Sequence, residues 1–456
     1  MEFRDFLAYL KKTGTLVEIE RPCSTDLEIA REIKANDGRP VLFRNVKGHA
    51  IPVAAGLFGF RGAFSLGTLS GDNVPSDQAA DILHEKRIPA TDPRSFINKL
   101  YRAIDGRKKP ELLGAGEKAP CQEIIDKPGS LDSLPILKHL QGDGGRYITS
   151  DVAIYTCPKH GRNISMHRML VLSRDRMVAR TVENRGLDTA IKEKKGEPLD
   201  AAIVIGNSSQ VLLAASTSPP KGVDELSVAN ALSPFKVVKC KTIDVEVPVD
   251  SEIVIEGRFL AERVDEGPFL DLTGTFDIVR KQPVFEVTCI TRRKDAIYHA
   301  LNPAGMEHQL LMGLPREATM LAELVKLDYI KDVRVTAGSS HWFNAVVQVD
   351  KSKQIDPVAV IQACFKGHGS LKNCTIVDDD IDIDDPNDVE FAVTTRSQFD
   401  KNLYLYPKQQ GSSLDPSSNQ VTRETCKVGI DATVPRAGHG AGYNKNFSRI
   451  SYCSKE

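Results

Sequence analysis

The feature that most constrains the fold of this chain is a series of short apolar runs between residues 135 and 300. Eight runs have the length and the β-branched or aromatic content of strands, and turn-forming or charged residues separate them. They read YITSDVAIYTC, MHRMLVLS, MVARTVE, AAIVIG, VLLAAS, FKVVKC, EIVIEGRF and PVFEVTCITRR. So many strands in one region predict an antiparallel sheet closed into a barrel or a sandwich. One helix is expected among them, at GVDELSVANAL.

The regions on either side carry mixed patterns of helix and strand. Near the N-terminus, residues 2–12 and 92–105 have helical spacing, PVLFRNV and IPVAAGLF are strand-like, and Thr25 with Glu28 resembles a capping box. Toward the C-terminus, the helical runs REATMLAELVKL and DPVAVIQACFK alternate with the strand-like runs AVVQVD, CTIVDD and EFAVTTR. We therefore expect a multidomain α/β protein, with domains at 1–115, 116–305 and 306–456.

Composition argues against several classes of protein. Sixty basic residues stand against sixty-one acidic ones, so no global charge favours nucleic acid or an anionic membrane surface. No stretch approaches the ~18 apolar residues of a membrane helix, and the start lacks a signal-peptide pattern, so we expect a cytoplasmic chain without an integral membrane segment. Nine scattered cysteines without CxxC pairs predict free thiols. The acidic run 377–388 lacks the Gly and the final Glu of a calcium loop, so solvated acids are expected there.

The first polar cluster of the strand-rich region is GRNISMHRM. Strand alternation places Asn163, Ser165 and His167 on one face and Arg168 on the other, unless a bulge intervenes. From the pattern alone, Arg168 could equally form a surface ion pair.

The second polar cluster is VDEGPFLDLTG. A turn at Gly-Pro would place Glu266 and Asp271 on either side of Phe269, and an apolar wall of this kind raises the pKa of a carboxyl group and favours acid catalysis. A surface turn with solvated acids is the alternative that this pattern leaves open.

Taken in order, these segments resemble the UbiD family of prenylated-FMN decarboxylases. The resemblance runs nearly end to end, through DFLAYLKKTGTLVEI, GRNISMHRM, AASTSPPKGVDELSVANAL, FKVVKC, VPVDSEIVIEGRF, DEGPFLDLTG, DAIYHA and CKVGIDAT. It implies an N-terminal α/β domain, a central split β-barrel that binds the flavin, and a C-terminal α/β domain for assembly into a homodimer or a higher homo-oligomer.

The resemblance also assigns residues to a cofactor site. It makes Asn163 and Glu225 ligands of a divalent metal, Mn2+ or Mg2+, which clamps the phosphate of prenylated FMN. Oxygen ligands of this kind suit a hard cation. Ser216 would lie at the cofactor and at an associated K+ site, and Lys427 would neutralise phosphate charge. The residues implied in cofactor binding are Asn163, Ser165, Arg168, Ser216, Glu225 and Lys427.

The catalytic set implied by the resemblance is Arg168, Glu266 and Asp271. Arg168 would orient the carboxylate of the substrate and pair with Glu266, and Asp271 would protonate carbon after CO2 leaves. Since family members carry Glu or Asp at this last position, Asp271 is within the pattern.

One departure from the family concerns the third metal ligand. Where many members carry a His, this chain reads TVENRGL, with Asn184 or Gly186 as the possible counterpart. The third ligand is therefore left open between an oxygen of Glu183 or Asn184 and water. His167 and His308 receive no role, because a packed imidazole is the more common case.

The function implied is the non-oxidative, potentially reversible decarboxylation of an α,β-unsaturated or aromatic carboxylic acid. One alternative within the family is the anhydromevalonate phosphate decarboxylase of archaeal isoprenoid synthesis, for which Lys221 or Lys236 could hold the second phosphate. Another is a flavin-binding or assembly protein without turnover. The expected partners are a small carboxylic acid and a flavin prenyltransferase that supplies the cofactor.

Overall fold

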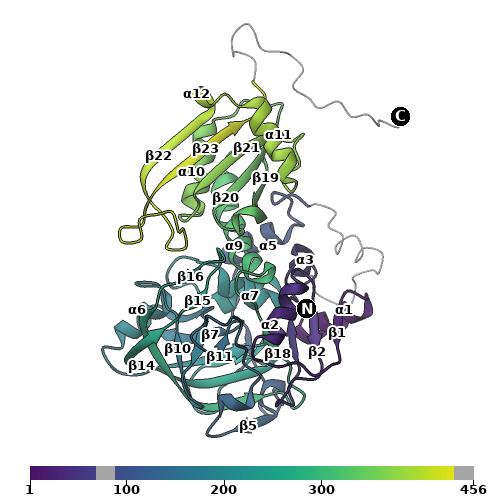
Figure 1. Cartoon of the computed structure of the whole chain (residues 1–456), viewed down its shortest axis with the longest axis vertical. Helices are drawn as coiled ribbons and strands as arrows, with labels where there is room; N and C mark the ends of the chain where they lie inside the picture. The colour runs from purple at the N-terminus through teal and green to yellow at the C-terminus, as the bar shows by residue number, and fades with distance from the viewer. Residues whose placement is uncertain (68–87, 436–456) are drawn as a thin grey trace. The chain divides into compact units, whose positions relative to one another are not determined.

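The computed structural model describes residues 1–67 and 88–435, which fall into two compact units (Figure 1). The first unit takes the chain up to residue 86 and again from 102 to 315, and the second takes residues 87–101 and everything from 316 onward. The mixed α/β class expected from the sequence is confirmed.

The elements of the first unit mix short helices with many strands. Their bounds are α1 (Phe3–Lys12), β1 (Val17–Ile19), α2 (Glu28–Ala35), β2 (Val41–Phe43), β3 (Val53–Ala55), α3 (Arg61–Gly67), β4 (Glu111–Leu112), β5 (Ile124–Asp126), β6 (Tyr147–Ile148), β7 (Val152–Cys157), β8 (Gly161–Ser165), β9 (Met169–Val171), β10 (Arg176–Ala179), α6 (Gly186–Glu193), β11 (Leu199–Ile205), α7 (Ser209–Ser216), α8 (Glu225–Leu232), β12 (Lys236–Lys239), β13 (Glu246–Pro248), β14 (Ile253–Glu266), β15 (Phe269–Leu270), β16 (Phe276–Asp277), β17 (Arg280–Arg292) and β18 (Tyr298–Ala300).

The second unit alternates helices with the strands of one sheet. Its elements are β19 (Ile330–Val335), β20 (Asn344–Val349), α10 (Pro357–Gly367), β21 (Asn373–Asp378), α11 (Pro386–Arg396), α12 (Phe399–Asn402), β22 (Leu403–Gln410) and β23 (Glu424–Ala432), and helices α5 (Phe96–Asp105) and α9 (Met306–Leu324) each have residues in both units.

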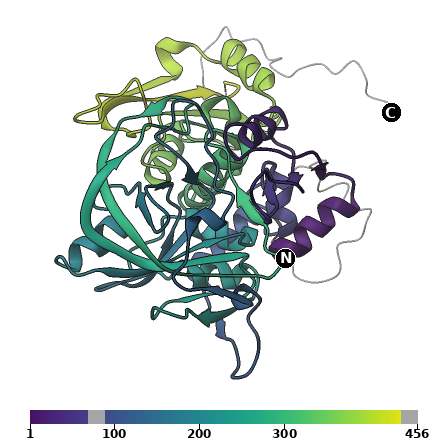
Figure 2. The ribbon, with the colours of Figure 1, turned by 60° about the horizontal axis from the view of Figure 1, so that its bottom comes forward.

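A large antiparallel sheet forms the centre of the first unit. Among the described residues its strand order is β6-β9-β10-β17-β14-β11-β7-β8, with β5 added beside β17. The path ends at β6 and β8, so the sheet stays open, as in a split barrel. The long pair β14 and β17 curves strongly (Figure 2), and its register shifts at Gly257, where an added Cβ would lie 2.1 Å from the carbonyl oxygen of Glu286. The predicted antiparallel sheet is confirmed.

Two strand predictions were wrong, and both segments are helices. The run VLLAAS belongs to α7, which is buried on nearly all sides and therefore shows no polar face for a helical period to reveal. The run EFAVTTR belongs to α11, which Asp385 caps by accepting a hydrogen bond from the backbone N–H of Asn387, with Pro386 as the first helical residue.

The N-terminal sheet is completed by a strand from a distant part of the chain. Its order is β1-β2-β3-β18, and β18 runs parallel to β3. The predicted capping interaction differs in its partner: Glu28 accepts from the backbone N–H of Ser24 at 2.8 Å, four residues before it. Buried residues of this sheet and of the large sheet form a single hydrophobic core, which contains Phe43, Val53 and Ile203 among others.

The second unit is built on the mixed sheet β19-β20-β21-β23-β22. The acidic run after β21 is tied into the fold: Arg396 pairs with Asp378 at 3.2 Å and with Asp380 at 2.8 Å. The eight cysteines among the described residues are free, as predicted, and Cys453 lies outside those residues.

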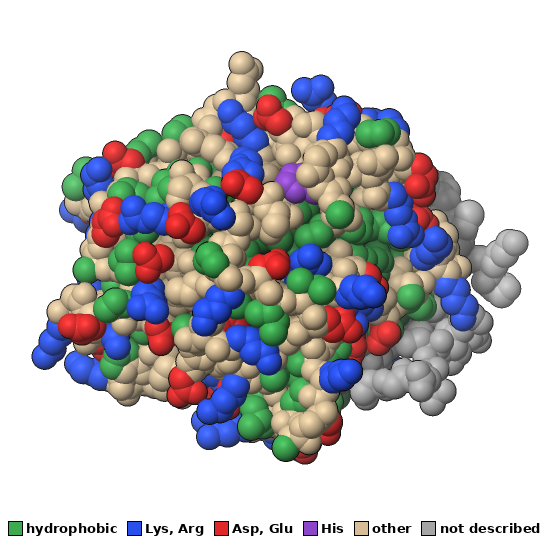
Figure 3. All heavy atoms as spheres, turned by 90° about the horizontal axis from the view of Figure 1, so that it is seen from below, with side chains coloured by type: hydrophobic (Ala, Val, Ile, Leu, Met, Phe, Trp, Pro, Cys, Tyr) green, Lys and Arg blue, Asp and Glu red, His purple; other side chains and the backbone are tan. Residues whose placement is uncertain are grey.

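Two properties of the described part of the chain bear on partners. No described helix is long and apolar enough to cross a membrane. On the face shown in Figure 3, basic and acidic side chains are interspersed rather than gathered by sign.

Candidate active site

Strands β7 and β8 place Asn163 at the start of the site. The two strands pair antiparallel with Tyr155 opposite Asn163, so both side chains lie on the same face of the sheet. The hydroxyl of Tyr155 donates to Oδ1 of Asn163 at 2.5 Å, and Nδ2 of Asn163 donates to Oε1 of Glu225 at 2.8 Å. The carboxamide is therefore held at both ends.

Glu225 is the first residue of α8 and the second member of this group. The preceding residue, Asp224, caps the helix and forms a bidentate pair with Arg162, with distances of 2.6 and 3.0 Å. The second carboxylate oxygen of Glu225 accepts from the backbone N–H of Ile164 at 3.0 Å. These contacts fix the carboxylate against β8.

The charge of Glu225 has no counterpart nearby. The residue is 4% exposed and has no ion-pair partner in the part of the chain that the structure describes. Burial raises the pKa of its carboxyl group to about 8. One carboxylate and one amide oxygen, without a cation of the protein beside them, fit a hard divalent metal.

Of the two possible counterparts of the family's His, Gly186 lies beside Asn163. A Cβ added to this residue would lie 2.8 Å from the Tyr155 hydroxyl oxygen and 3.0 Å from Oδ1 of Asn163, so Gly186 is the neighbour of Asn163. Oδ1 of Asn184 instead accepts from Lys192 at 3.1 Å, and Glu183 is exposed. Within 1–67 and 88–435, no group of three or more His, Cys, Asp or Glu side chains is placed to hold a metal. Among these described residues, Asn163 and Glu225 are the candidate ligands.

Arg168 joins the two polar motifs of the sequence. Strand β8 ends at Ser165, so Arg168 lies in the irregular stretch before β9 rather than on the far face of a continuous strand. Its Nε and Nη2 donate to the two carboxylate oxygens of Glu266 at 2.8 and 3.0 Å, and Nη1 lies 3.5 Å from Oδ2 of Asp271. Although burial alone lowers the pKa of Arg168, the hydrogen bonds and charge of Glu266 raise it.

An aromatic wall closes one side of this cluster, as the Gly-Pro turn predicts. The Arg168 guanidinium lies over the ring of Phe269, 5.3 Å from its centroid. Tyr147 packs against the same ring and its hydroxyl donates to Oε1 of Glu266 at 3.3 Å. Glu266 is fully buried, whereas the side chain of Asp271 keeps 20% of its exposure.

Three further members of the ionic cluster were not predicted from the sequence. Asp277, on β16, accepts from Nη2 of Arg168 at 3.0 Å and from Nε of Arg180 at 3.2 Å, and it pairs with Arg280 at 2.6 Å. Burial opposes ionisation of Asp277, but these three arginines lower its pKa to about 2. Burial, and the nearby charge of Arg280, lower the pKa of Arg180, which marks a positive environment.

The two histidines that received no role have different surroundings. The ring of His167 bridges Ser165 and the backbone carbonyl of Arg180, at 2.8 and 2.9 Å, and burial lowers its pKa to about 4. His308 is half-buried, and it interacts electrostatically with Asp271 and Arg168. Its Nδ1 accepts from the backbone N–H of Ala304, so the neutral ring carries its proton on Nε2. His308 is thus a neighbour of the ionic cluster that the sequence did not indicate.

The remaining predicted residues occupy other places. Ser216, at the end of α7, donates to the carbonyl of Leu212 at 2.9 Å and lies 3.2 Å from the sulfur of Met166. Lys427 is on β23 of the second unit, where its Nζ donates to the carbonyl of Gly369 at 2.6 Å and burial lowers its pKa. Lys236 pairs with Glu117 on the small sheet β13-β12-β4.

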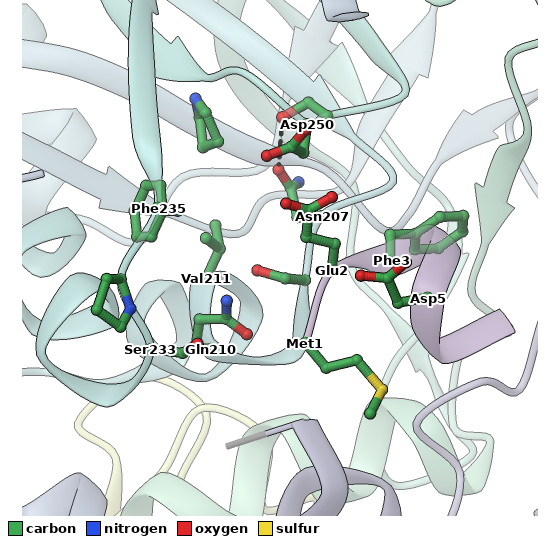
Figure 4. A pocket seen from close by; sticks show the side chains of 14 residues that line it. Met1, Glu2, Phe3, Asp5, Asn207, Gln210, Val211, Ser233, Phe235 and Asp250 are labelled. Carbon is green, nitrogen blue, oxygen red and sulfur yellow. Dashed lines mark hydrogen bonds between the residues drawn. The ribbon is translucent and has the colours of Figure 1, made fainter. Parts of the chain in front are cut away.

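A cavity of about 250 Å³ lies near the opposite end of α7 from Ser216 (Figure 4). Gln210 and Val211 of the first turn of α7 line it, together with Glu2, Phe235 and Asp250. None of the residues predicted for the site is in its lining. The candidate site is therefore defined by its polar groups and not by this cavity.

Family models of three domains match most of this chain. The 3-octaprenyl-4-hydroxybenzoate carboxy-lyase N-terminal domain matches residues 7–81, the Rift-related domain residues 114–306 and the C-terminal domain residues 309–432. Two curated relatives are named anhydromevalonate phosphate decarboxylase. That of Methanosarcina mazei is 38% identical over 437 residues, which cover 95% of this chain and 96% of the relative. That of Methanothermobacter thermautotrophicus is 36% identical over 457 residues, with 98% and 99% covered.

Solved structures agree with these matches. The UbiD-class enzyme HmfF from Pelotomaculum thermopropionicum, in complex with FMN, is 35% identical and matches with a TM-score of 0.88, covering 99% of this chain and 97% of that one. The split sheet, the buried arginine–carboxylate cluster and these relatives together define a carboxy-lyase, that is, a decarboxylase. The chain belongs to the UbiD family.

Proposed function

We propose that this chain decarboxylates anhydromevalonate phosphate, with prenylated FMN as cofactor. The observation that carries the proposal is the shared name of five curated relatives, all anhydromevalonate phosphate decarboxylases, at 33–40% identity. This substrate was the alternative interpretation of the sequence, and the relatives support it better than an aromatic acid. The aromatic acid remains the second candidate, because the matching family models are named for 3-octaprenyl-4-hydroxybenzoate.

The cofactor proposal rests on the donor set and on two structures of HmfF, one in complex with FMN and one with prFMN. Asn163 and Glu225 would hold Mn2+ or Mg2+, which in turn would bind the flavin phosphate. Ser165 and Ser216 complete the proposed cofactor set within the first unit, with K+ near Ser216. Lys427 belongs to the second unit, and its role in neutralising phosphate charge stays a prediction from the sequence. Bound prenylated FMN would supply the electron sink that decarboxylation requires.

Arg168 would bind the carboxylate of the substrate through Nη1. Its Nε and Nη2 are already engaged by Glu266 and Asp277, whereas the contact from Nη1 to Asp271 is long, at 3.5 Å. Asp271 keeps partial exposure and lies beside that nitrogen, so it can deliver a proton to the carbon that loses CO2. Phe269 and Tyr147 shield the pair from water.

The phosphate of the substrate would bind near Arg180. Lys221 and Lys236 were the cations expected for this role, but Lys236 is engaged by Glu117 on a separate sheet. Arg180, Arg168 and Arg280 instead converge on one carboxylate, Asp277. A guanidinium in such a positive environment is suited to a phosphate dianion.

The test compares three acids on protein co-produced with a flavin prenyltransferase. CO2 release is measured with anhydromevalonate phosphate, with its dephosphorylated acid and with 3,4-dihydroxybenzoate. We expect kcat/KM for the phosphorylated acid to exceed the others on the order of a hundredfold, because charge-assisted hydrogen bonds to phosphate are lost in the others. Preference for the aromatic acid would overturn the substrate proposal, and bound prenylated FMN without any CO2 release would favour a non-catalytic flavin-binding or assembly protein.

A matched pair of variants locates the phosphate. Arg180→Met should raise KM for the phosphorylated acid by about tenfold and leave that for the dephosphorylated acid unchanged. Arg176→Met is the control, because Arg176 begins β10, the strand that ends just before Arg180, but pairs with Glu262 at the surface. Equal effects of the two variants would remove Arg180 from the site.

The proposal extends to the cofactor supplier, the localisation and the oligomeric state of the enzyme. A flavin prenyltransferase would supply the cofactor, and the chain would work in the cytoplasm as a homodimer or a higher homo-oligomer. Size-exclusion chromatography with light scattering measures the oligomer directly, and a monomeric mass for the active enzyme would contradict the last of these points.

A further inference from the structure

The carboxamide of Asn163 is held in one orientation by its two neighbours. Nδ2 of Asn163 donates to Oε1 of Glu225 at 2.8 Å, so the nitrogen of the carboxamide lies on that side. The oxygen must then face Tyr155, whose hydroxyl donates to it at 2.5 Å. A carboxamide oxygen has two lone pairs, so one remains for a further ligand.

Tyr155 is well suited to act as a fixed donor. Its side chain is fully buried on β7, in register with Asn163, and its hydroxyl also lies 3.3 Å from Oγ of Ser165. A phenol has an ordinary pKa of about 10, so this hydroxyl is a hydrogen-bond donor at neutral pH. Neither neighbour of this hydroxyl is charged, and both lie on β8.

Gly186 leaves the space that the tyrosine hydroxyl requires. A Cβ at this position would lie 2.8 Å from the hydroxyl oxygen and 3.0 Å from Oδ1 of Asn163, closer than such contacts allow. Any larger residue at the start of α6 would therefore displace the hydroxyl, the carboxamide or both. The position of the Tyr155 hydroxyl therefore depends on the absence of a side chain at Gly186.

We infer that Tyr155 is a positioning residue for the metal site, that it orients Asn163 as a metal ligand, and that Gly186 is required for this arrangement. The inference rests on the proposed function, which makes Asn163 and Glu225 the metal ligands. It assigns the metal two side chains of this protein and leaves its other positions to water and phosphate.

Mn2+ binding to the full-length protein, without substrate, tests this inference. Isothermal titration gives the affinity, and the EPR spectrum of bound Mn2+ reports on the symmetry of its ligands. We expect Tyr155→Phe and Gly186→Ala each to weaken binding by about tenfold, as loss of an outer hydrogen-bond partner commonly does. Their combination should weaken binding by less than the sum of the two separate losses, because one of the two atoms that the new Cβ would meet, the Tyr155 hydroxyl oxygen, has gone.

Tyr147→Phe is the matched control. Tyr147 is also fully buried and also donates to a site carboxylate, Glu266, but it has no contact with Asn163. It should lower turnover and leave Mn2+ affinity unchanged. Thermal unfolding without metal identifies a variant that has lost its fold. A second test needs no variant: EPR spectra of Mn2+ bound to the wild type are recorded in water enriched in oxygen-17. Water bound to the metal then broadens the spectral lines.

The outcomes separate the inference from the function on which it rests. No Mn2+ binding by the wild type would refute the proposed metal site itself. Three other outcomes would refute the inference and leave the proposed function intact. They are Mn2+ binding by the wild type with the same affinity in Tyr155→Phe, strictly additive losses in the double variant, and the absence of oxygen-17 broadening.

Discussion

Glu225 and Glu266 are both buried in the first unit, and their surroundings are opposite. Glu266 receives a bidentate guanidinium from Arg168, whereas Glu225 receives only a carboxamide and a backbone N–H. Burial raises the pKa of Glu225 to about 8. The first carboxylate is already compensated within the protein, and the second is compensated only when a cation arrives. The comparison matches the roles proposed for the two residues, Glu266 in the chemistry and Glu225 in holding the metal and cofactor.

Breaking the compensated pair should have the largest effect. Arg168→Met leaves Glu266 buried without its partner, and we expect a loss of about 3 to 5 kcal/mol in unfolding free energy together with loss of turnover. Urea denaturation measures the first and CO2 release the second. Arg146→Met is the control, because Arg146 pairs with the exposed Asp132 and should change stability by less than about 1 kcal/mol. A similar small change for Arg168→Met would show that Glu266 needs no counter-charge.

Adding Mn2+ should stabilise the protein through the region around Glu225. Mn2+ at a hundred times its dissociation constant should stabilise the wild type by about 2.7 kcal/mol, and chelation should reverse this. Glu225→Gln keeps a side chain of the same shape without the charge and should abolish the stabilisation. Thermal unfolding with and without Mn2+ measures both. If Glu225→Gln is stabilised as much as the wild type, the metal binds elsewhere.

His308 extends the comparison to the surroundings of Glu266, and among the described residues it forms no ion pair. Its ring interacts electrostatically with Asp271 and Arg168, so His308→Asn should lower kcat/KM by about tenfold through loss of this interaction, with cofactor occupancy unchanged. Steady-state kinetics and the visible spectrum measure the two quantities. A loss of cofactor instead would place His308 with Glu225.

Asp277 should give the smallest effect, visible only in acid. Its folded-state pKa is about 2, below the value near 3.8 of an unpaired aspartate, so its stabilisation is present above about pH 4 and is lost as the pH falls toward 2. We expect about 1 kcal/mol of the stability lost between pH 5 and pH 3 to depend on Asp277. Urea titrations of the wild type and Asp277→Asn across this range measure it. Parallel pH profiles for the two proteins would contradict the assignment.

The strand runs of the sequence predict the antiparallel sheet around the site. The two short segments alone left Arg168, Glu266 and Asp271 open as surface residues, and only the resemblance of the whole chain to the UbiD family assigned these three to the site. The turn that presents Phe269 could also be predicted, since Gly and Pro mark such turns.

Other features depend on contacts between distant segments, which no local pattern contains. Asp277 lies near Arg168 because β15 pairs with β16. His308 lies near Arg168 because of the position of the start of α9. Strand β18 completes a sheet that begins almost 300 residues earlier. Tyr155 belongs to an ordinary apolar strand run, and only the register of β7 with β8 places it beside Asn163. The all-apolar α7 was misread because periodicity fails when every face is buried.

The roles proposed for the two carboxylates are tested by comparing Glu225→Gln with Glu266→Gln, both co-produced with a flavin prenyltransferase. Metal and prenylated FMN are quantified by mass spectrometry, and CO2 release from anhydromevalonate phosphate is followed in parallel. We predict that Glu225→Gln loses metal and cofactor, and that Glu266→Gln retains both but releases no CO2. Full cofactor in Glu225→Gln, or undiminished CO2 release by Glu266→Gln, would contradict the roles assigned to the two carboxylates.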